Sequence, residues 1–503
     1  MEIKVGKYTL DKEQSDIVID NNKYLLVAAG AGSGKTLTIL GKLSYLLKEM
    51  NPSEIICISF TKAASQSLKN KISEELKTEI NVYTFHALAL EILENKYAIA
   101  MPNTLELIVE HFLKTEILEN KELLKKLLKY LNVKSCDDYI KNFENNEKIK
   151  MLENLICTFI RLFKCNNFKL IDYNAFLEKI KSINNFIKYK KETIFLTITL
   201  NCYLRYEKYL DENKEIDFDD MLIKAKEKVD SNNYHKKIKY IIIDEYQDTS
   251  LVRFNFIKSI LEKTNANLLV VGDDFQSIYR FTGCDLSLFI DFKKFFKNAQ
   301  IKKIQNTYRN SQELINVAGK FVMKNKSQIE KNLKSSKHIN KPIVIVKYKN
   351  EKNDFASLIE KIYFETKSPI LVLGRNNFDI NEVIDKNKFI INDDKIIYKT
   401  NKNINIRYLT AHKSKGLEEE NVIIINLKNK ILGFPNQKKD ASVLRLVTNY
   451  NVTYPYDEER RLFYVALTRT KNKVYLYTPH NPSIFVTELL KEHKKYIEII
   501  KIS

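Results

Sequence analysis

The 503-residue sequence contains no tryptophan and no run of about 18 apolar residues, the length that a membrane-crossing helix needs. The opening residues MEIKVGKYTLDKEQ lack the apolar segment of a secretion signal, so we expect a cytoplasmic protein with no membrane partner. Glycine and serine do not gather into a linker, and no segment repeats at a fixed period. The few cysteines show no C-x-x-C spacing, which argues against zinc sites and disulfides. They are Cys57, Cys136, Cys157, Cys165, Cys202 and Cys284.

The composition is that of a globular protein with several domains. Apolar residues make up 44% of the chain, and its length is enough for about three or four domains. The 83 Lys and Arg residues outnumber the 63 Asp and Glu residues, and the net charge of +20 favours a polyanionic partner such as a nucleic acid. Because lysine is abundant throughout, charge by itself does not identify which lysines bind that partner.

Short apolar segments alternate with amphipathic segments in two parts of the chain. The first part contains 24–29, 54–60 and 79–85, and it resumes with 239–248 and 266–274. The second part, from about residue 301, contains 342–348, 369–375, 421–427 and 473–479. Between about 89 and 215 the apolar spacing is helical. Alternation of this kind predicts parallel sheets covered by helices, so we expect an α/β fold with two similar cores and an inserted helical domain.

The segment AGAGSGKT, residues 29–36, follows the first apolar run and precedes an amphipathic one. Its glycines let the backbone aim amide groups at phosphate oxygens. Lys35 supplies a charge for the β and γ phosphates, and Thr36 offers a hydroxyl to Mg²⁺. Ala29 replaces the first glycine of the usual pattern, where only backbone curvature is required. The segment predicts a binding site for a nucleoside triphosphate, formed by Gly30, Ala31, Gly32, Ser33, Gly34, Lys35 and Thr36.

Two further apolar runs end in acidic residues. YIIIDEYQD places Asp244 and Glu245 at the carboxyl end of a strand, where a parallel sheet presents groups to a ligand. Asp244 can hold Mg²⁺ while Glu245 polarises the attacking water. In LLVVGDDFQSIYRFTG, the amide of Gln276 can orient that water or sense the γ-phosphate. These residues predict hydrolysis of the bound nucleotide.

Arginines in the second region can complete such a site. Arg309 in NTYRN and Arg469 in ALTRT can neutralise transition-state charge on the γ-phosphate if they reach across a cleft. A lone arginine is more often ion-paired at a surface. Similarly, Tyr279 and Phe281 form an aromatic pair that could be a stacking platform or part of a core. The assignment of all four residues therefore depends on the motifs around them.

Nine segments follow one another in the order LDKEQ, AGAGSGKT, FTKAA, TFHALA, IIIDEYQD, VVGDDFQSIYRFTG, NTYRN, LTAHKSKGLEEENVIIINL and EERRLFYVALTRT. This series resembles the motifs of the UvrD/Rep branch of superfamily 1 helicases. The resemblance implies ATP bound between two RecA-like domains, 1A at 1–94 and 216–295 and 2A at 296–503, with the helical domain 1B at 95–215. Only about a hundred residues separate Arg309 from Thr410, so we expect the family's 2B subdomain to be absent or vestigial.

The resemblance also implies an activity and residue roles. The expected activity is that of an ATP- and Mg²⁺-dependent translocase and helicase moving 3′ to 5′ on single-stranded and tailed duplex DNA. Gln14 would contact the adenine edge, Tyr308 would stack on the base, and Glu418 would meet the sugar or link hydrolysis to movement. Stacking tolerates any sequence, and lysines follow phosphates. The implied DNA contacts are Phe60, Thr84, His86, Tyr279, Phe281, His412 and Lys415.

Two other functions remain open from the sequence. The same motor could remodel protein–nucleic acid complexes, as a subunit of a repair, defence or RNA polymerase associated assembly, without unwinding DNA alone. A chain of a different class would be a nucleotide switch that binds nucleic acid without moving along it. The pair of Glu245 and Arg469 argues against the switch, because both residues serve repeated hydrolysis.

Overall fold

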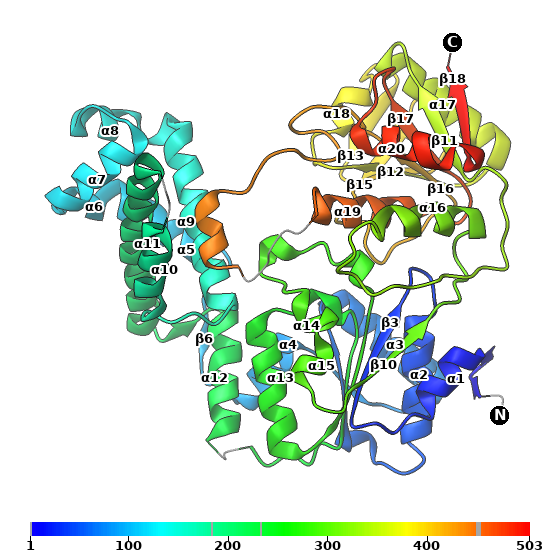
Figure 1. Cartoon of the computed structure of the whole chain (residues 1–503), viewed down its shortest axis with the longest axis horizontal. Helices are drawn as coiled ribbons and strands as arrows, with labels where there is room; N and C mark the ends of the chain where they lie inside the picture. Colours follow the sequence, from blue (N-terminus) through cyan, green and yellow to red (C-terminus); the bar gives the residue numbers. More distant parts are fainter. Residues whose placement is uncertain (1–2, 183–184, 232–233, 449–453, 503) are drawn as a thin grey trace.

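The computed structural model describes residues 3–182, 185–231, 234–448 and 454–502. In the view of Figure 1, two α/β bodies lie one above the other and a helical body lies to their left. The amino terminus lies beside the lower α/β body, and the carboxyl terminus lies at the top of the upper one. The fold is therefore the predicted α/β class with two RecA-like sheets and an inserted helical part.

The lower sheet contains, among the described residues, six strands in the order β10, β3, β9, β8, β4 and β5. Each described pair of neighbours is parallel. Because the carboxyl ends of parallel strands meet at one edge, the segments that follow β3, β8 and β9 lie side by side there. The bounds are β3 Tyr24–Ala29, β4 Ile55–Ser59, β5 Asn81–Thr84, β8 Tyr240–Ile243, β9 Asn267–Gly272 and β10 Gln300–Ile304.

Helices cover both faces of this sheet, which is why its four inner strands, β3, β9, β8 and β4, are largely apolar. Leu26 and Ile243 pack on one face, and Leu25 and Val27 pack on the other. A short hairpin, β1 Lys4–Val5 and β2 Tyr8–Thr9, precedes the first helix. The helices are α1 Lys12–Val18, α2 Lys35–Leu46, α3 Lys62–Leu76, α4 Phe85–Ile92, α12 Phe218–Asp230, α13 Leu251–Thr264, α14 Ser287–Ile290 and α15 Phe292–Phe295.

The helical body is inserted between α4 and α12. Its entry and exit are joined by a short parallel pair, β6 Ala98–Ile99 and β7 Glu215–Ile216. Aromatic rings hold its centre together, with Phe159 packing against Phe176 and Phe195. No helix of the described residues is long and apolar enough to cross a membrane. The helices are α5 Thr104–His111, α6 Ile117–Glu119, α7 Lys121–Leu131, α8 Cys136–Asn142, α9 Glu147–Cys165, α10 Asp172–Lys181 and α11 Phe186–Glu212.

The upper sheet contains, within the described ranges, eight strands in the order β13, β14, β15, β12, β16, β17, β11 and β18. Its core strands are parallel, while β14 pairs antiparallel with β13 and β15. The strands are β11 Ile343–Lys347, β12 Ile370–Gly374, β13 Phe389–Asn392, β14 Lys395–Tyr398, β15 Ile406–Thr410, β16 Asn421–Ile424, β17 Val474–Thr478 and β18 Ile497–Lys501. The helices are α16 Gln312–Val322, α17 Glu351–Thr366, α18 Ile380–Val383, α19 Asp457–Leu467 and α20 Ile484–His493.

Residues 309–410, all of them described, form α16 to α18 and β11 to β15; strands β12 to β15 lie at one end of the upper sheet, and β11 lies near the other end between β17 and β18. The expected domain boundary at residue 296 is too early, however. Strand β10 pairs with β3 of the lower sheet, Gln300 opposite Leu25 and Ile304 opposite Ala29. The sequence pattern could not decide this, because β10 has the sequence QIKKI, and a short half-polar strand at a domain boundary fits the edge of either sheet.

A segment between β16 and α19 crosses from the upper body to the helical body (Figure 1). We call residues 428–448 the strap. Its short helix η7, Ser442–Leu446, packs beside the helical body, where Glu192 accepts hydrogen bonds from Ser442 and Arg445. Asn166 of the helical body donates to the carbonyl of Val447 at 3.0 Å. The strap therefore connects the upper α/β body to the helical body.

Candidate functional site

The segment between β3 and α2 forms the predicted phosphate loop. Gly32 and Gly34 have φ values of +70° and +79°, which side chains rarely adopt, and Gly34 is the residue from which α2 begins. A Cβ on Gly32 would lie 2.5 Å from Cβ of Arg309, and one on Gly34 would lie 2.7 Å from Nε2 of Gln14. The loop is therefore shaped by glycine and enclosed by the residues that the sequence assigned to the same ligand.

The acidic residues after β8 meet the lysine of the loop. Nζ of Lys35 lies 2.7 Å from Oε1 of Glu245, and the other oxygen of Glu245 accepts a hydrogen bond from Gln247 at 2.7 Å. Glu245 has a φ of +52°, a strained conformation for a residue with a side chain. Backbone strain of this kind is typical of active sites, where the surroundings impose it. Here it turns the carboxylate toward Lys35.

Burial and neighbouring charges separate the two carboxyl groups. Burial raises the pKa of Asp244 to about 6, and the charge of Glu245 adds to this rise. Burial also acts on Glu245, but the charges of Lys35 and Lys415 outweigh it and lower the pKa of Glu245 to about 2. At neutral pH Glu245 is therefore the firmly ionised group, as a residue that orients water requires.

Arg469 reaches this site from the upper body. It follows α19, its side chain is buried, and it donates to Oε1 of Gln276 at 3.2 Å. Burial lowers the pKa of Arg469 to about 9. The amide nitrogen of Gln276 donates to Asp273 at 2.7 Å. The lower and upper bodies thus meet at Gln276, which the sequence analysis assigned to the γ-phosphate.

Arg309, Glu418 and Tyr308 lie at the rim of the phosphate loop. Nε of Arg309 donates to Glu418 at 2.6 Å, and the amide of Tyr308 donates to the carbonyl of Gly32 at 3.0 Å. The Tyr308 hydroxyl donates to Asp11 at 2.9 Å, and the ring is 63% exposed. Gln14 donates to the carbonyl of Ser33 at 3.2 Å. An exposed ring beside a buried amide is an arrangement suited to a nucleobase.

The donor set also fits a magnesium ion and phosphate groups. Thr36 and Asp244 carry the hydroxyl and carboxylate oxygens that Mg²⁺ prefers, and a cation would favour the ionised form of Asp244. The hydroxyl of Ser33 is buried in the loop with no hydrogen-bond partner among the described residues. Such a hydroxyl suits a bound phosphate oxygen. No cluster of three or more His, Cys, Asp or Glu residues within the described ranges forms a separate metal site.

The predicted DNA-contacting residues fall into two neighbouring groups. Phe60, Thr84 and His86 follow β4 and β5. The ring of Phe60 packs against Phe85 at 5.1 Å, and Thr84 caps α4 by accepting from Ala87 at 3.1 Å. Burial lowers the pKa of His86 to about 4, so the imidazole is neutral at physiological pH. His86 can therefore contact DNA by stacking or hydrogen bonding, and not as a cation.

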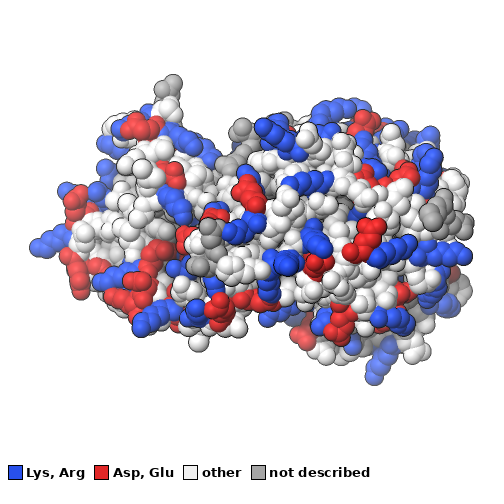
Figure 2. Space-filling view, turned by 90° about the horizontal axis from the view of Figure 1, so that it is seen from below, with Lys and Arg blue, Asp and Glu red and all other residues white. Residues whose placement is uncertain are grey.

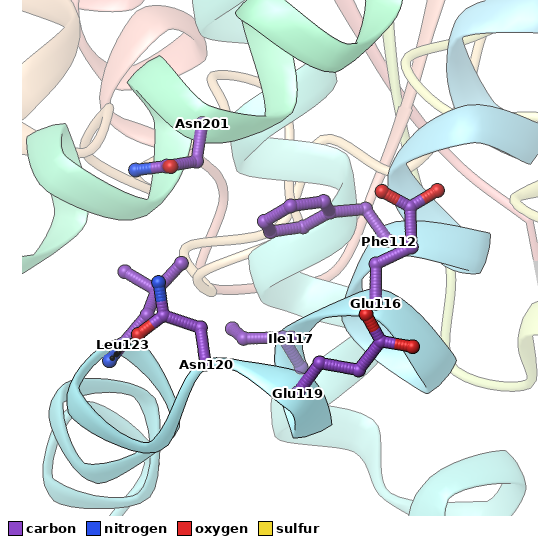
Figure 3. A pocket seen from close by; sticks show the side chains of 7 residues that line it. All are labelled: Phe112, Glu116, Ile117, Glu119, Asn120, Leu123 and Asn201. Atoms are coloured by element: carbon purple, nitrogen blue, oxygen red, sulfur yellow. Dashed lines mark hydrogen bonds between the residues drawn. The ribbon is translucent and has the colours of Figure 1, made fainter.

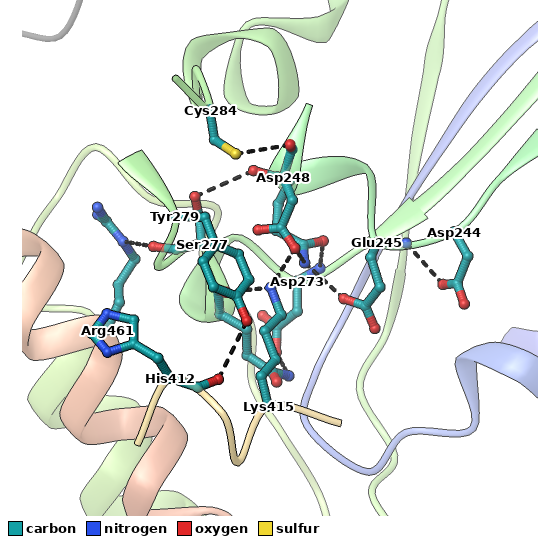
Figure 4. A network of polar contacts seen from close by, with 12 residues as sticks. Asp244, Glu245, Asp248, Asp273, Ser277, Tyr279, Cys284, His412, Lys415 and Arg461 are labelled. Atoms are coloured by element: carbon teal, nitrogen blue, oxygen red, sulfur yellow. Dashed lines mark hydrogen bonds and ion pairs between the residues drawn. The ribbon is translucent and has the colours of Figure 1, made fainter. Parts of the chain in front are cut away.

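The second group surrounds the loop after β9 (Figure 4). Tyr279 donates to the carbonyl of His412 at 3.2 Å, and the rings of Phe281 and His412 are 5.7 Å apart. Phe281 is 60% exposed, so it can receive a base. Lys415 differs from its sequence assignment: it is almost buried and ion-paired with Asp248 at 2.5 Å. In this conformation Lys415 links motifs of the two bodies and does not present a free charge to a phosphate.

Several residues of this network were not predicted. Arg253 of α13 stacks over Phe60 at 5.3 Å and donates to the carbonyl of Asp248 at 3.3 Å, so it connects the two DNA groups. Arg461 of α19 donates to the carbonyl of Ser277 at 2.6 Å (Figure 4). The motif IIIDEYQD contained Asp248, but Arg253 lies in an ordinary amphipathic helix, and no local signal separates it from surface arginines.

Surface charge and one cavity of the helical body lie outside this network. On the face shown in Figure 2, basic and acidic side chains are interspersed, so the net charge does not form one patch there. A cavity of about 350 Å³ lies in the helical body between Phe112, Leu123 and Asn201 (Figure 3). Its wall contains Glu116, which is ion-paired with Arg205 at 2.7 Å. None of its lining residues belongs to the predicted site.

Comparison with known proteins agrees with this geometry. A family model of the UvrD/REP helicase N-terminal domain matches residues 10–297, and one of the UvrD-like helicase C-terminal domain matches 379–480. The chain is 28% identical to DNA helicase IV of Escherichia coli over 97% of its own length and 71% of that protein. It is 30% identical to the ATP-dependent DNA helicase Rep of Buchnera aphidicola (strain APS), covering 88% of itself and 61% of Rep. With the PcrA helicase of Staphylococcus epidermidis it shares 27% identity and spans 41% of that protein.

Proposed function

This chain belongs to the UvrD/Rep helicase family and is an ATP-hydrolysing enzyme, and from that premise we propose that it moves 3′ to 5′ along single-stranded DNA and separates tailed duplexes. The observation that carries the proposal is the hydrogen bond of 3.2 Å from Arg469 to Gln276. It joins the second body to a residue beside the phosphate loop of the first. Hydrolysis at such a shared site changes how the two bodies fit together.

In the proposed reaction, each group of the first body has a separate task. Lys35 binds the β and γ phosphates of ATP, and Glu245 accepts a hydrogen bond from the attacking water and orients it. Gln276 holds the same water from its amide. Mg²⁺ held by Thr36 and Asp244 would neutralise phosphate charge. Lys35 pairs with Glu245 at 2.7 Å, and phosphate groups bound to Lys35 would compete with this ion pair and free the carboxylate for the water.

The second body contributes the arginines and thereby the mechanical step. Arg469 and Arg309 neutralise charge that develops on the γ-phosphate, so ATP favours the closed arrangement of the two bodies. Release of phosphate removes this attraction and the bodies separate. Lys415 in the second body and Asp248 in the first are ion-paired at 2.5 Å, so the same movement alters the loop that carries Tyr279 and Phe281. The two bodies then bind the DNA strand alternately, and this alternation gives the movement its direction.

A steady-state ATPase assay with and without single-stranded DNA tests the enzymatic part. We expect DNA to stimulate turnover by about 10-fold or more, because DNA stabilises the closed state. Lys35→Ala and Glu245→Gln should reduce turnover about 1,000-fold, since each removes a group that acts on the reacting phosphate. Lys69→Ala, at an exposed lysine of α3 outside the segment FTKAA, is the matched control. Turnover that is indifferent to DNA would contradict the proposal.

Polarity is tested with duplexes that carry a single-stranded tail at one end. We expect displacement of the shorter strand from 3′-tailed and not from 5′-tailed substrates. Salt concentration must be held constant, because phosphate contacts weaken steeply as salt rises. Displacement from 5′ tails alone would reverse the proposed direction.

A second candidate is a motor that strips or remodels proteins on nucleic acid without unwinding duplex by itself. It is favoured by residues 309–410, which form only strands and helices of the upper body, in the interval where the family resemblance implies a 2B subdomain in UvrD and Rep. Such a motor would need a partner protein, as in a repair or defence complex. Displacement of streptavidin from a biotinylated single strand, combined with failure on every tailed duplex, would identify this function.

A further inference from the structure

A buried ion cluster behind the phosphate loop contains a lysine that the reaction described above does not use. Lys331 lies between α16 and β11, and its side chain is 0% exposed. Its Nζ lies 2.5 Å from Asp273 and 2.6 Å from Asp274, which are also 0% exposed. The ammonium group sits 3.7 Å from the centre of the Phe275 ring. A charge is retained inside a protein at a large desolvation cost, so this lysine calls for a physical explanation.

The cluster continues directly to the catalytic amide. Oδ1 of Asp273 accepts a hydrogen bond from the Lys331 ammonium group. The other oxygen, Oδ2, accepts a hydrogen bond from the amide nitrogen of Gln276 at 2.7 Å. The carbonyl oxygen of Gln276 then accepts from Arg469 at 3.2 Å. The four residues form one chain of contacts from Lys331 through Asp273 and Gln276 to Arg469. A carboxylate can only accept, so an ionised Asp273 fixes which end of the amide faces Arg469.

We propose that Lys331 is a positioning residue for ATP hydrolysis: its ammonium holds the Asp273 carboxylate in place, and Asp273 thereby orients Gln276 so that its carbonyl faces Arg469. The proposal rests on the role of Gln276 in the proposed function. Without a cation, two adjacent buried carboxyl groups cannot both remain charged, and a proton would settle on the pair. Asp273 would then lose the partner that holds its carboxyl group in place, and the Gln276 amide could turn its nitrogen toward Arg469, where two donors repel.

The surroundings of Lys331 support a role at this site over a role in general packing. The segment around it wraps the phosphate loop: the amide of Thr307 donates to Lys334 at 2.8 Å, and Leu333 occupies the space above Gly30. Lys331 also lies 3.4 Å from the carbonyl of Ala29 at the start of the loop. Other ionisable groups that act on Asp273 or Asp274 are Lys35, Arg469 and Tyr464.

The charge count around Asp273 gives a discriminating experiment. The native cluster holds one positive and two negative groups. Lys331→Met removes the positive group and leaves the two adjacent buried carboxyl groups without a cation. In Lys331→Met/Asp274→Asn, one carboxylate remains and the net charge equals that of the native cluster. The new amide of residue 274 can still accept from the backbone of Ile329, which now donates to Asp274 at 2.8 Å.

We expect kcat for ATP hydrolysis to fall about 100-fold in Lys331→Met, as misplacement of a catalytic group does, with KM for ATP within about threefold of the native value. The double variant should recover at least 10-fold of the lost kcat, and Asp274→Asn alone should stay near the native rate. Should Lys331→Met fail to fold, the double variant is compared with Asp274→Asn, and their kcat values should agree within about threefold.

A folded Lys331→Met with native kcat, or a double variant as slow as Lys331→Met, would overturn the proposal, because packing alone predicts no recovery from a second change. Melting temperatures of all variants report the structural effect separately. The readout is hydrolysis without DNA, so it remains decisive even if the chain proves not to move on DNA. Conversely, if the variants show the expected kcat values but the native chain does not move along DNA, the proposed function is wrong and the role of Lys331 stands.

Discussion

Lys415 of the upper body and Asp248 of the lower body form an ion pair with an N to O distance of 2.5 Å, and both side chains are nearly buried. Lys415 also donates to the carbonyl of Gln276 at 2.8 Å. Its ammonium lies 5.0 Å from the centre of the Tyr279 ring. One lysine therefore contacts the segment after β8, the catalytic loop after β9 and the aromatic group expected to hold DNA. This contact links the candidate nucleotide site directly to the residues expected to bind DNA.

Breaking this pair from one side should destabilise the protein more than removing both partners. Lys415→Met leaves the Asp248 carboxylate buried without its cation, at a cost of about 3 kcal/mol. Lys415→Met/Asp248→Asn leaves no buried charge and should recover much of that loss. Thermal unfolding of the four proteins of this double-mutant cycle measures the effect. A loss in the double variant equal to the sum of the two single-variant losses would show that the pair is not coupled.

Tyr308 should contribute to nucleotide binding through its ring. Tyr308→Ala removes a stacking surface worth about 1 kcal/mol, so KM for ATP should rise about fivefold with little change in kcat. Tyr308→Phe keeps the ring and loses the hydrogen bond to Asp11, so its KM should stay near the native value. If Tyr308→Phe raised KM as much as Tyr308→Ala does, the hydroxyl and not stacking would account for the contribution of Tyr308 to ATP binding.

Stability should fall as the solution is acidified below pH 6.5. Burial lowers the pKa of both His86 and His412 to about 4, while in the unfolded chain each keeps the ordinary histidine value. Between these values the unfolded state binds more protons, so each histidine contributes stability that is complete above about pH 6.5 and lost as the pH falls toward 4.

The matched test of this linkage replaces both histidines. His86→Gln/His412→Gln should show a smaller drop in melting temperature between pH 7 and pH 5 than the native protein. His480→Gln, at an exposed histidine, serves as the control. An unchanged slope in the double variant would show that other groups cause the acid sensitivity.

The strap should release locally when its apolar anchor is shortened. Leu446 is 2% exposed and packs with Val443 and Val447 in the core shared by the lower and helical bodies. Leu446→Ala should cost about 2 kcal/mol, so backbone amides of 443–447 should exchange with deuterium about 30-fold faster. Ile431→Ala, at a residue that is 67% exposed on the same strap, should leave exchange unchanged. Faster exchange in both variants would mean that the strap is not anchored at Leu446.

Much of the candidate nucleotide site could be predicted from short stretches of sequence. The glycines of the phosphate loop require positive φ values, and Lys35 and Thr36 follow because a helix begins there, so the whole unit is local. Asp244 and Glu245 were assigned because a buried strand ends immediately before them. The fold class was equally accessible, since alternating apolar strands and amphipathic helices predict helix-covered parallel sheets.

Contacts between distant segments were not accessible in this way. Lys331, Arg253 and the strap carry no local pattern, because lysines and arginines of similar surroundings occur throughout a chain with 83 such residues. Strand β10 joined the lower sheet although its sequence also suited the upper one. Lys415 was assigned to DNA by its motif, and only the approach of Asp248 across the two bodies paired it internally.

The sequence by itself determined the chemistry that depends on neighbouring residues: the anion-binding turn, the paired acids at a strand end and the periodicity of each element. The tertiary structure decided which charges neutralise one another, because a buried charge takes its partner from whatever segment the packing brings within about 4 Å. That choice separates Lys331 and Lys415, both buried and paired, from the many lysines that remain in solvent.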